Sequence, residues 1–183
     1  DPANPMQEQM LKFSNLCNDS TNVEGQEIGD PTETAMVNLG DKKGISAQEV
    51  RDACPRSSEV PFDNDRKLMS TFHKMKDGYT MITKGAVDVM LKRVDYIQKG
   101  GKIFPVTEVD VENICRVNEQ YSESGLRVLG IGYRHFLVEK NISTEDEQGL
   151  VFLGLLAMMD PPRTESAAAV SDCKRAGICP VMI

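Results

Sequence analysis

Hydrophobic residues near the start of the chain recur at the three- and four-residue spacing of one helix face. Asn4 and Pro5 stand immediately before this run and supply an N-cap and a first-turn proline. The run passes through Met10 and Phe13 and reaches Cys17. A helix over residues 5–17 is therefore predicted.

A second helix start follows a polar loop, at Gly29-Asp30-Pro31-Thr32-Glu33. Asp30 is placed to cap the helix, Pro31 takes the first helical position, and Glu33 stands where a capping box puts its carboxylate. Gly40 is expected to end this helix. A third helix should open at Ser46 and finish near Pro55, because proline cannot continue a helix.

From Val60 onward the hydrophobic period changes to two. Two alternating runs, 67–74 and 79–84, flank Asp77-Gly78 and predict a β-hairpin. Further strands are predicted over 126–136 and 150–158. Helices are predicted from Ala86 to about Val94 and from Thr107 to Tyr121, the latter closed by Gly125. Strands and helices alternate irregularly, so an α+β fold with an antiparallel or mixed sheet flanked by helices is expected.

The segment Asp160-Pro161-Pro162-Arg163 breaks this pattern, because two prolines cannot continue the ladder of the preceding strand. Thr164 can then cap an alanine-rich helix that ends at Gly177, and residues 178–183 look like a strand. We expect one domain over 1–158, and a hinge with the truncated start of a neighbouring domain over 159–183.

Composition and charge narrow the class of protein. The chain has 183 residues, 40% of them hydrophobic, with no stretch near the roughly 20 apolar residues of a membrane span and no signal-peptide pattern. A soluble piece is expected. The net charge of −7 argues against nucleic acid and against anionic membrane surfaces as partners. Residues 62–102 nevertheless carry nine Lys and Arg against five Asp and Glu, which suits either a small anionic ligand or a solvated strand face.

Cysteine and histidine usage predicts no metal site. The five cysteines form no C-x-x-C pair, so neither a disulfide framework nor a zinc knuckle is indicated, and a reducing compartment is the simpler interpretation. His73 and His135 lie far apart and share no ligand spacing with a cysteine. A Walker A loop, a G-x-G-x-x-G motif and a G-x-S-x-G elbow are all absent from the sequence.

Several residues are candidates for ligand contact, each with an ordinary structural alternative. Glu33 is a capping acid or an acceptor for an exocyclic amine, and Phe62 is a core ring or a stacking face at the mouth of a strand. Lys67 and Lys84 either extend off a sheet edge or share a phosphate, which would relieve the repulsion between two close ammonium groups. The remaining candidates are Gly85, which permits close backbone approach, and Arg127, a phosphate or ribose contact or a surface arginine.

Four islands in order carry a family resemblance: Gly29-Asp30-Pro31-Thr32-Glu33, Phe62-Asp63-Asn64-Asp65-Arg66-Lys67, Lys84-Gly85-Ala86 and Asp160-Pro161-Pro162-Arg163. Together they resemble the nucleotide-binding domain of P-type ATPases of the calcium, sodium/potassium and proton pump type. Residues 159–183 resemble the resumption of the phosphorylation domain, which has a haloacid-dehalogenase-like fold.

The resemblance implies a role for each matching residue. It implies that Glu33 contacts adenine with Thr32 nearby, and that Phe62 stacks on the base. Its further implications are pocket-lining positions for Lys67, Lys84 and Gly85, a phosphate contact for Arg127 and a hinge position for Asp160. Asn64 stands where some family members carry an arginine.

The resemblance also implies a whole protein. The chain would bind ATP and present it to the phosphorylation domain of an ATP-driven cation translocase, with calcium as the expected ion and Mg²⁺ as a further cofactor. The whole protein would span the cell membrane, with this domain on the cytoplasmic side and not touching the membrane itself. The Asp-Lys-Thr-Gly phosphorylation motif is absent here, so the piece alone is expected to be catalytically inactive. The alternatives are a stand-alone nucleotide-sensing or interaction module and a fragment of a haloacid-dehalogenase-type phosphatase.

Overall fold

A computed structural model of the chain describes residues 4–23, 25–159 and 164–181. The helices are α1 Pro5–Leu16, α2 Pro31–Lys42, α3 Ala47–Ala53, α4 Val87–Met90, α5 Glu108–Glu123 and α6 Thr164–Arg175, with the 3-10 turns η1 Leu91–Arg93 and η2 Thr144–Asp146. The strands are β1 Thr21–Val23, β2 Gln26–Ile28, β3 Arg56–Asp63, β4 Leu68–Met75, β5 Gly78–Gly85, β6 Val94–Lys99, β7 Lys102–Pro105, β8 Arg127–Phe136 and β9 Leu150–Met158.

A mixed sheet forms the centre of the fold. Within the described residues it has seven strands in the order β3-β4-β5-β8-β9-β6-β7, and β1 pairs with β2 in a separate ribbon. Strands β6 and β9 run parallel, whereas the other neighbouring pairs run antiparallel. The predicted α+β fold with a mixed sheet flanked by helices is therefore confirmed.

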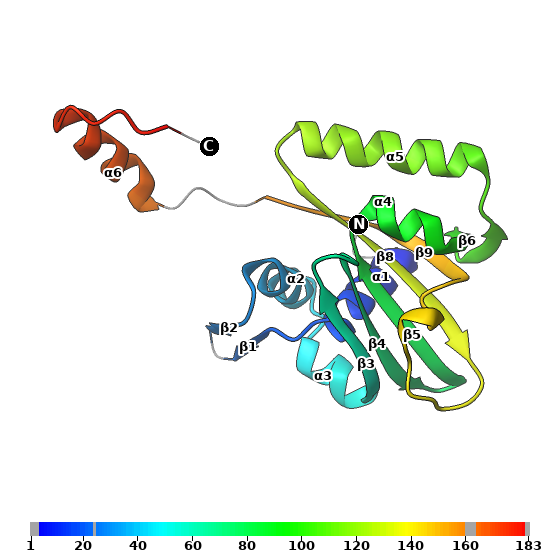
Figure 1. Ribbon diagram of the computed structural model, residues 1–183. Helices are drawn as coiled ribbons and strands as arrows, with labels where there is room; N and C mark the ends of the chain where they lie inside the picture. The colour runs from blue at the N-terminus through cyan, green and yellow to red at the C-terminus, as the bar shows by residue number, and fades with distance from the viewer. Residues whose placement is uncertain (1–3, 24, 160–163, 182–183) are drawn as a thin grey trace.

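Helices cover both faces of the sheet, with α1 on one face and α4 and α5 on the other (Figure 1). Side chains alternate between the faces along each strand. Met69 and Ile82 pack with Phe13 and Leu16 of α1, whereas their neighbours in β4 and β5 pack on the opposite side. The resulting cores hold α1, and with it the loop after α1, against the ends of β4 and β5.

Local capping signals fixed the helix starts as predicted. Asn4 caps α1, Asp30 caps α2, Ser46 caps α3, and Thr107 forms a capping box with Asp110 at the start of α5. The hairpin also forms, although Met75 pairs with Gly78, so its two turn residues are Lys76 and Asp77. Strands β8 and β9 match the predicted ranges within one residue.

Gly40 does not end the second helix, which continues to Lys42, so that prediction was wrong. A Cβ at Gly40 would lie 2.5 Å from Asn15 Nδ2 and 2.9 Å from the Ile45 carbonyl oxygen. Gly40 therefore allows α2 to approach α1 closely. The chain instead turns after the helix at Gly44, whose φ is +74°.

Other differences are at the edges of the fold. Residues 178–181 are not in a strand, contrary to prediction, and the helix expected from Ala86 is only α4 followed by the 3-10 turn η1. The hairpin of β6 and β7 was not predicted. Its turn, Gly100-Gly101, has φ of +56° and +80° and was a readable signal. The predicted boundary at 160–163 lies outside the described residues.

His73 gives the fold a testable pH dependence. Its Nδ1 donates to the Cys54 carbonyl at 2.9 Å, and burial lowers the pKa of His73 from 6.5 to about 4. In the unfolded chain the His73 side chain binds a proton below pH 6.5, whereas in the folded chain it stays neutral until the pH approaches 4. The contribution of His73 is thus intact above pH 6.5 and is lost as the pH falls toward 4.

We expect His73 to account for a loss of about 2 kcal/mol in the free energy of unfolding between pH 7 and pH 5. His73→Asn keeps a donor near the Nδ1 position and removes the titration. Urea unfolding at both pH values should show a smaller loss for this variant than for the unmodified chain. Equal losses in the two proteins would contradict the assignment.

Candidate functional site

A pocket of about 390 Å³ opens where the N-terminus of α2 faces the ends of β3, β5 and β8. It is lined by Asp19, Asp30, Thr32, Glu33, Met36, Phe62, Met69, Lys84, Arg127 and Leu129. Residues from the first three sequence islands thus converge with Arg127 at one place. Of the predicted site residues, the structure brings Thr32, Glu33, Phe62, Lys84 and Arg127 together here.

The N-terminus of α2 is tightly organised by Asp30. Its Oδ1 accepts a hydrogen bond from the Thr32 N–H at 2.8 Å. Burial by itself raises the pKa of Asp30, but the hydrogen bonds from Thr32 and Glu33 and the charge of Arg127 outweigh it, so the pKa is lowered. Asp30 is therefore ionised at neutral pH and fixes the direction in which Thr32 and Glu33 enter the pocket.

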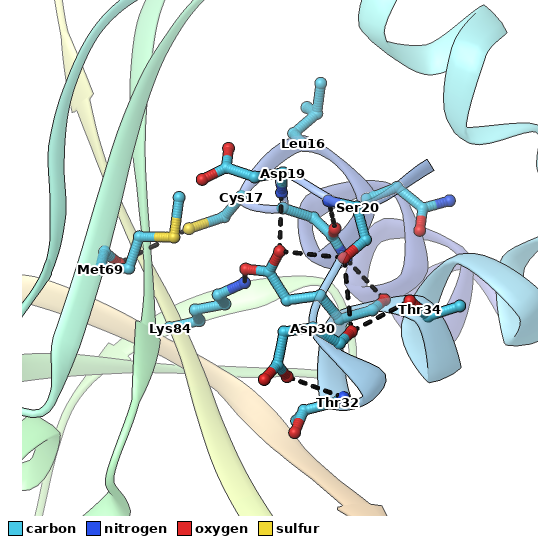
Figure 2. A network of polar contacts seen from close by, with 12 residues as sticks. Leu16, Cys17, Asp19, Ser20, Asp30, Thr32, Thr34, Met69 and Lys84 are labelled. Atoms are coloured by element: carbon cyan, nitrogen blue, oxygen red, sulfur yellow. Dashed lines mark hydrogen bonds and ion pairs between the residues drawn. The ribbon is translucent and has the colours of Figure 1, made fainter. Parts of the chain in front are cut away.

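Glu33 is held by the loop after α1. Its Oε2 accepts from the Asp19 N–H at 2.9 Å and from the Ser20 hydroxyl at 3.3 Å, while Oε1 forms an ion pair with Lys84. Figure 2 shows Asp19, Ser20 and Lys84 converging beside Asp30 and Thr32 at the start of α2. The capping-box role predicted for Glu33 was wrong, because its carboxylate is directed across to the loop and to β5.

The loop that holds Glu33 is itself fixed by two arginines. Arg51 donates to the carbonyl oxygens of residues 15, 18 and 20, and Arg56 donates to those of residues 16 and 18. These bonds satisfy carbonyls at and just beyond the end of α1. The arginines thus hold the loop whose Asp19 N–H and Ser20 hydroxyl bond to Glu33, which favours a single orientation of the Glu33 carboxylate.

Lys84 lines the pocket and is only 6% exposed. The positive charge of its ammonium group is balanced by the ion pair with the Glu33 carboxylate. The expected close pair of lysines does not form this site, because Lys67 is exposed, lies in the turn between β3 and β4 and is not among the lining residues. The backbone φ of Lys67 is +55°, a left-handed value that directs the chain into β4.

Phe62 stands at the pocket mouth near the end of β3 and is 57% exposed. The core alternative for this ring is therefore wrong. Met36, Met69 and Leu129 supply the apolar part of the lining. An exposed ring next to an apolar wall is an arrangement suited to a flat aromatic ligand.

Arg127 is exposed at the start of β8, and its Nη1 donates to Thr32 Oγ1 at 2.7 Å. Gly85 is buried and does not line the pocket. The close approach at Gly85 is made by the chain itself, because a Cβ there would lie 2.2 Å from the Lys67 carbonyl oxygen. Asp160 lies outside the described residues.

Several residues of the site had no sequence signal. Asp19, Ser20, Met36, Met69 and Leu129 become neighbours only through tertiary packing. Over the described ranges, no group of three or more His, Cys, Asp or Glu side chains is arranged to hold a metal ion. None of the helices there has the length and apolar character of a membrane span.

Comparison with known proteins gives a consistent result. The sequence profile described as P-type ATPase, cytoplasmic domain N, matches residues 6–165. A calcium-transporting ATPase of Listeria monocytogenes is 42% identical over 95% of this chain and 20% of its own length. Calcium-transporting ATPase 1 of Bacillus cereus is 38% identical over 98% of the chain, again 20% of its own length. The cation-transporting ATPase pma1 of Synechocystis is 35% identical over 95% of this chain and 20% of its own length. The chain therefore spans about a fifth of these relatives.

Proposed function

Because the chain belongs to the P-type ATPases as their cytoplasmic domain N, we propose that its pocket binds the adenine nucleotide of ATP. In the whole protein it would present the γ-phosphate to the phosphorylation domain of an ATP-driven cation transporter. Calcium is the proposed ion, since the relatives from Listeria and Bacillus are named calcium-transporting ATPases.

The observation that carries this proposal is the exposed Phe62 ring, which lines the same pocket as the largely buried ion pair of Glu33 and Lys84. The ring offers a stacking face for a purine. A carboxylate has about four lone-pair sites, and Glu33 uses three of them for Asp19, Ser20 and Lys84. Within the part of the chain that the structure describes, one acceptor site of Glu33 therefore remains for the exocyclic amine of adenine. Thr32 sits beside Glu33 and keeps Arg127 at the same pocket.

Arg127 is proposed to contact the phosphate chain, because it is an exposed cationic residue of the lining, whereas Met36 and Met69 of the apolar lining are buried. The exposed Lys67 adds positive charge near Phe62 without lining the pocket. Mg²⁺ would be bound with the triphosphate and with groups outside this chain. Catalysis by the domain itself would consist of positioning, and the chain alone would not hydrolyse ATP.

The proposed organisation has an ATP-binding domain over 1–158, and a hinge with the start of the phosphorylation domain over 159–183. Helix α6 fits that division, because its described side chains are exposed except for the partly exposed Cys173. The partners would then be ATP and the remaining domains of the same protein. The domain would work on the cytoplasmic side of the membrane in which the transporter lies.

Arg127→Ala tests the direction in which the nucleotide lies. We expect it to weaken ATP binding about threefold to tenfold, which is the range for one exposed charge-assisted contact. AMP binding should change less than about twofold, since AMP lacks the β- and γ-phosphates. Calorimetric titration with both nucleotides is the measurement. The control is Arg116→Ala on the exposed side of α5, which should alter neither affinity. Equal losses for ATP and AMP would place Arg127 at the base instead.

A further inference from the structure

Phe62 lies in an irregular part of the sheet. Val60 pairs with Ser70 and Asp63 pairs with Leu68, with a register shift between them. Residues 61 and 62 on β3 thus stand opposite one residue of β4, which is the geometry of a β-bulge. Pro61 has no N–H to donate. The ladder therefore does not fix the backbone of Pro61 and Phe62, and another interaction is needed to set the direction of the ring.

The turn after Phe62 brings that interaction back to the bulge. Asp63 Oδ1 accepts from the N–H groups of Asp65 at 3.1 Å and Arg66 at 2.8 Å. This Asx turn reverses the chain, so that Arg66 faces the residues just before it. Arg66 Nη2 then donates to the Pro61 carbonyl oxygen at 2.5 Å. The carbonyl belongs to the peptide bond that leads into Phe62.

The other arm of the guanidinium is anchored in the core. Arg66 Nη1 pairs with Glu147 Oε1 at 2.5 Å, and Glu147 is fully buried. The same Oε1 accepts from the Ser70 hydroxyl at 2.6 Å, and Arg93 Nη1 lies 3.4 Å from Oε2. Glu147 is thus fixed to β4 and to η1, and it provides a rigid point to which Arg66 attaches the bulge.

We infer that Arg66 is a positioning residue for nucleotide binding, which it supports by holding Phe62 at the pocket mouth before any ligand arrives. This inference rests on the proposed function and adds a residue that does not line the pocket. The planar guanidinium of Arg66 bonds to the Pro61 carbonyl and to the Glu147 carboxylate at once, and a lysine ammonium cannot match that geometry. Pre-ordering the ring removes part of the entropy that binding would otherwise lose.

Arg66→Lys tests the inference, because lysine can keep the ion pair with Glu147 while giving up the Pro61 carbonyl. We expect ATP and AMP affinities each to fall about threefold to tenfold. In a Phe62→Ala background the same substitution should change affinity by less than about 1.5-fold, since the coupling is with that ring. Arg93→Lys is the matched control: Arg93 also contacts Glu147 but not the bulge, so it should leave both affinities unchanged.

A second readout needs no nucleotide. The NMR order parameter of the Phe62 amide should be lower in Arg66→Lys than in the unmodified chain and unchanged in Arg93→Lys. Unchanged order and affinity in Arg66→Lys would overturn the inference, as would an equal loss in Arg93→Lys or a loss that persists without the Phe62 ring. Failure of the proposed function is distinct: the unmodified chain would then not bind ATP, while the order parameters would still decide the role of Arg66.

Discussion

Replacing Lys84 with methionine is expected to lower the free energy of unfolding by about 3 kcal/mol, because it leaves a largely buried carboxylate without its counter-charge. The side chains of Lys84 and Glu33 are only 7% and 16% exposed, so solvent replaces the missing partner only in part. The hydrogen bonds from Asp19 and Ser20 to Glu33 keep the expected loss at the lower end of the range for breaking a buried ion pair. Urea unfolding monitored by circular dichroism measures it.

The control for this prediction removes both charges. Lys84→Met combined with Glu33→Gln should recover most of the stability that Lys84→Met loses, since a pair deleted as a whole leaves no unpaired charge. Stability of Lys84→Met within about 0.5 kcal/mol of the unmodified chain would contradict the account, as would a double variant no more stable than the single one.

Phe62→Ala is expected to weaken ATP and AMP alike, by about tenfold to a hundredfold, because stacking acts on the base that both share. The ring is 57% exposed, so the free energy of unfolding should change little. Fluorescence competition or calorimetric titration measures the affinities. Phe104→Ala on the outer strand β7, where the ring is 44% exposed, is the matched control and should affect neither nucleotide. A large loss of ATP affinity with AMP unaffected would place the ring at the phosphates and not at the base.

Local signals predicted much of the fold. The starts of α1, α2, α3 and α5 followed from capping residues and prolines, because the groups that satisfy a helix N-terminus are near neighbours in sequence. The hairpin of β4 and β5 followed from its turn. The order of the strands did not, and neither did the parallel pairing of β6 with β9, since these depend on packing between segments that are distant along the chain.

The candidate site divides in the same way. The sequence islands identified Thr32, Glu33, Phe62 and Lys84, and Arg127 was proposed from its position at the start of a strand; the structure places all five around one pocket. What the islands could not indicate was the ion pair of Glu33 with Lys84, because it joins residues 51 positions apart. The same limit applies to Arg66, whose contact with Glu147 spans 81 positions. Gly40 shows the opposite problem: its local signal predicted a helix end, but a tertiary contact with Asn15 explains the glycine.

The most direct test of nucleotide binding in this pocket is an NMR titration of the isolated chain with ATP. We expect chemical-shift changes concentrated at five residues of the pocket lining, Thr32, Glu33, Phe62, Lys84 and Arg127. They should saturate with a Kd between roughly tens of micromolar and millimolar, about −4 to −6 kcal/mol, since one stacked ring and a few polar contacts cannot give tighter binding. Unchanged resonances of these residues at millimolar ATP, or changes centred elsewhere on the fold, would contradict this prediction.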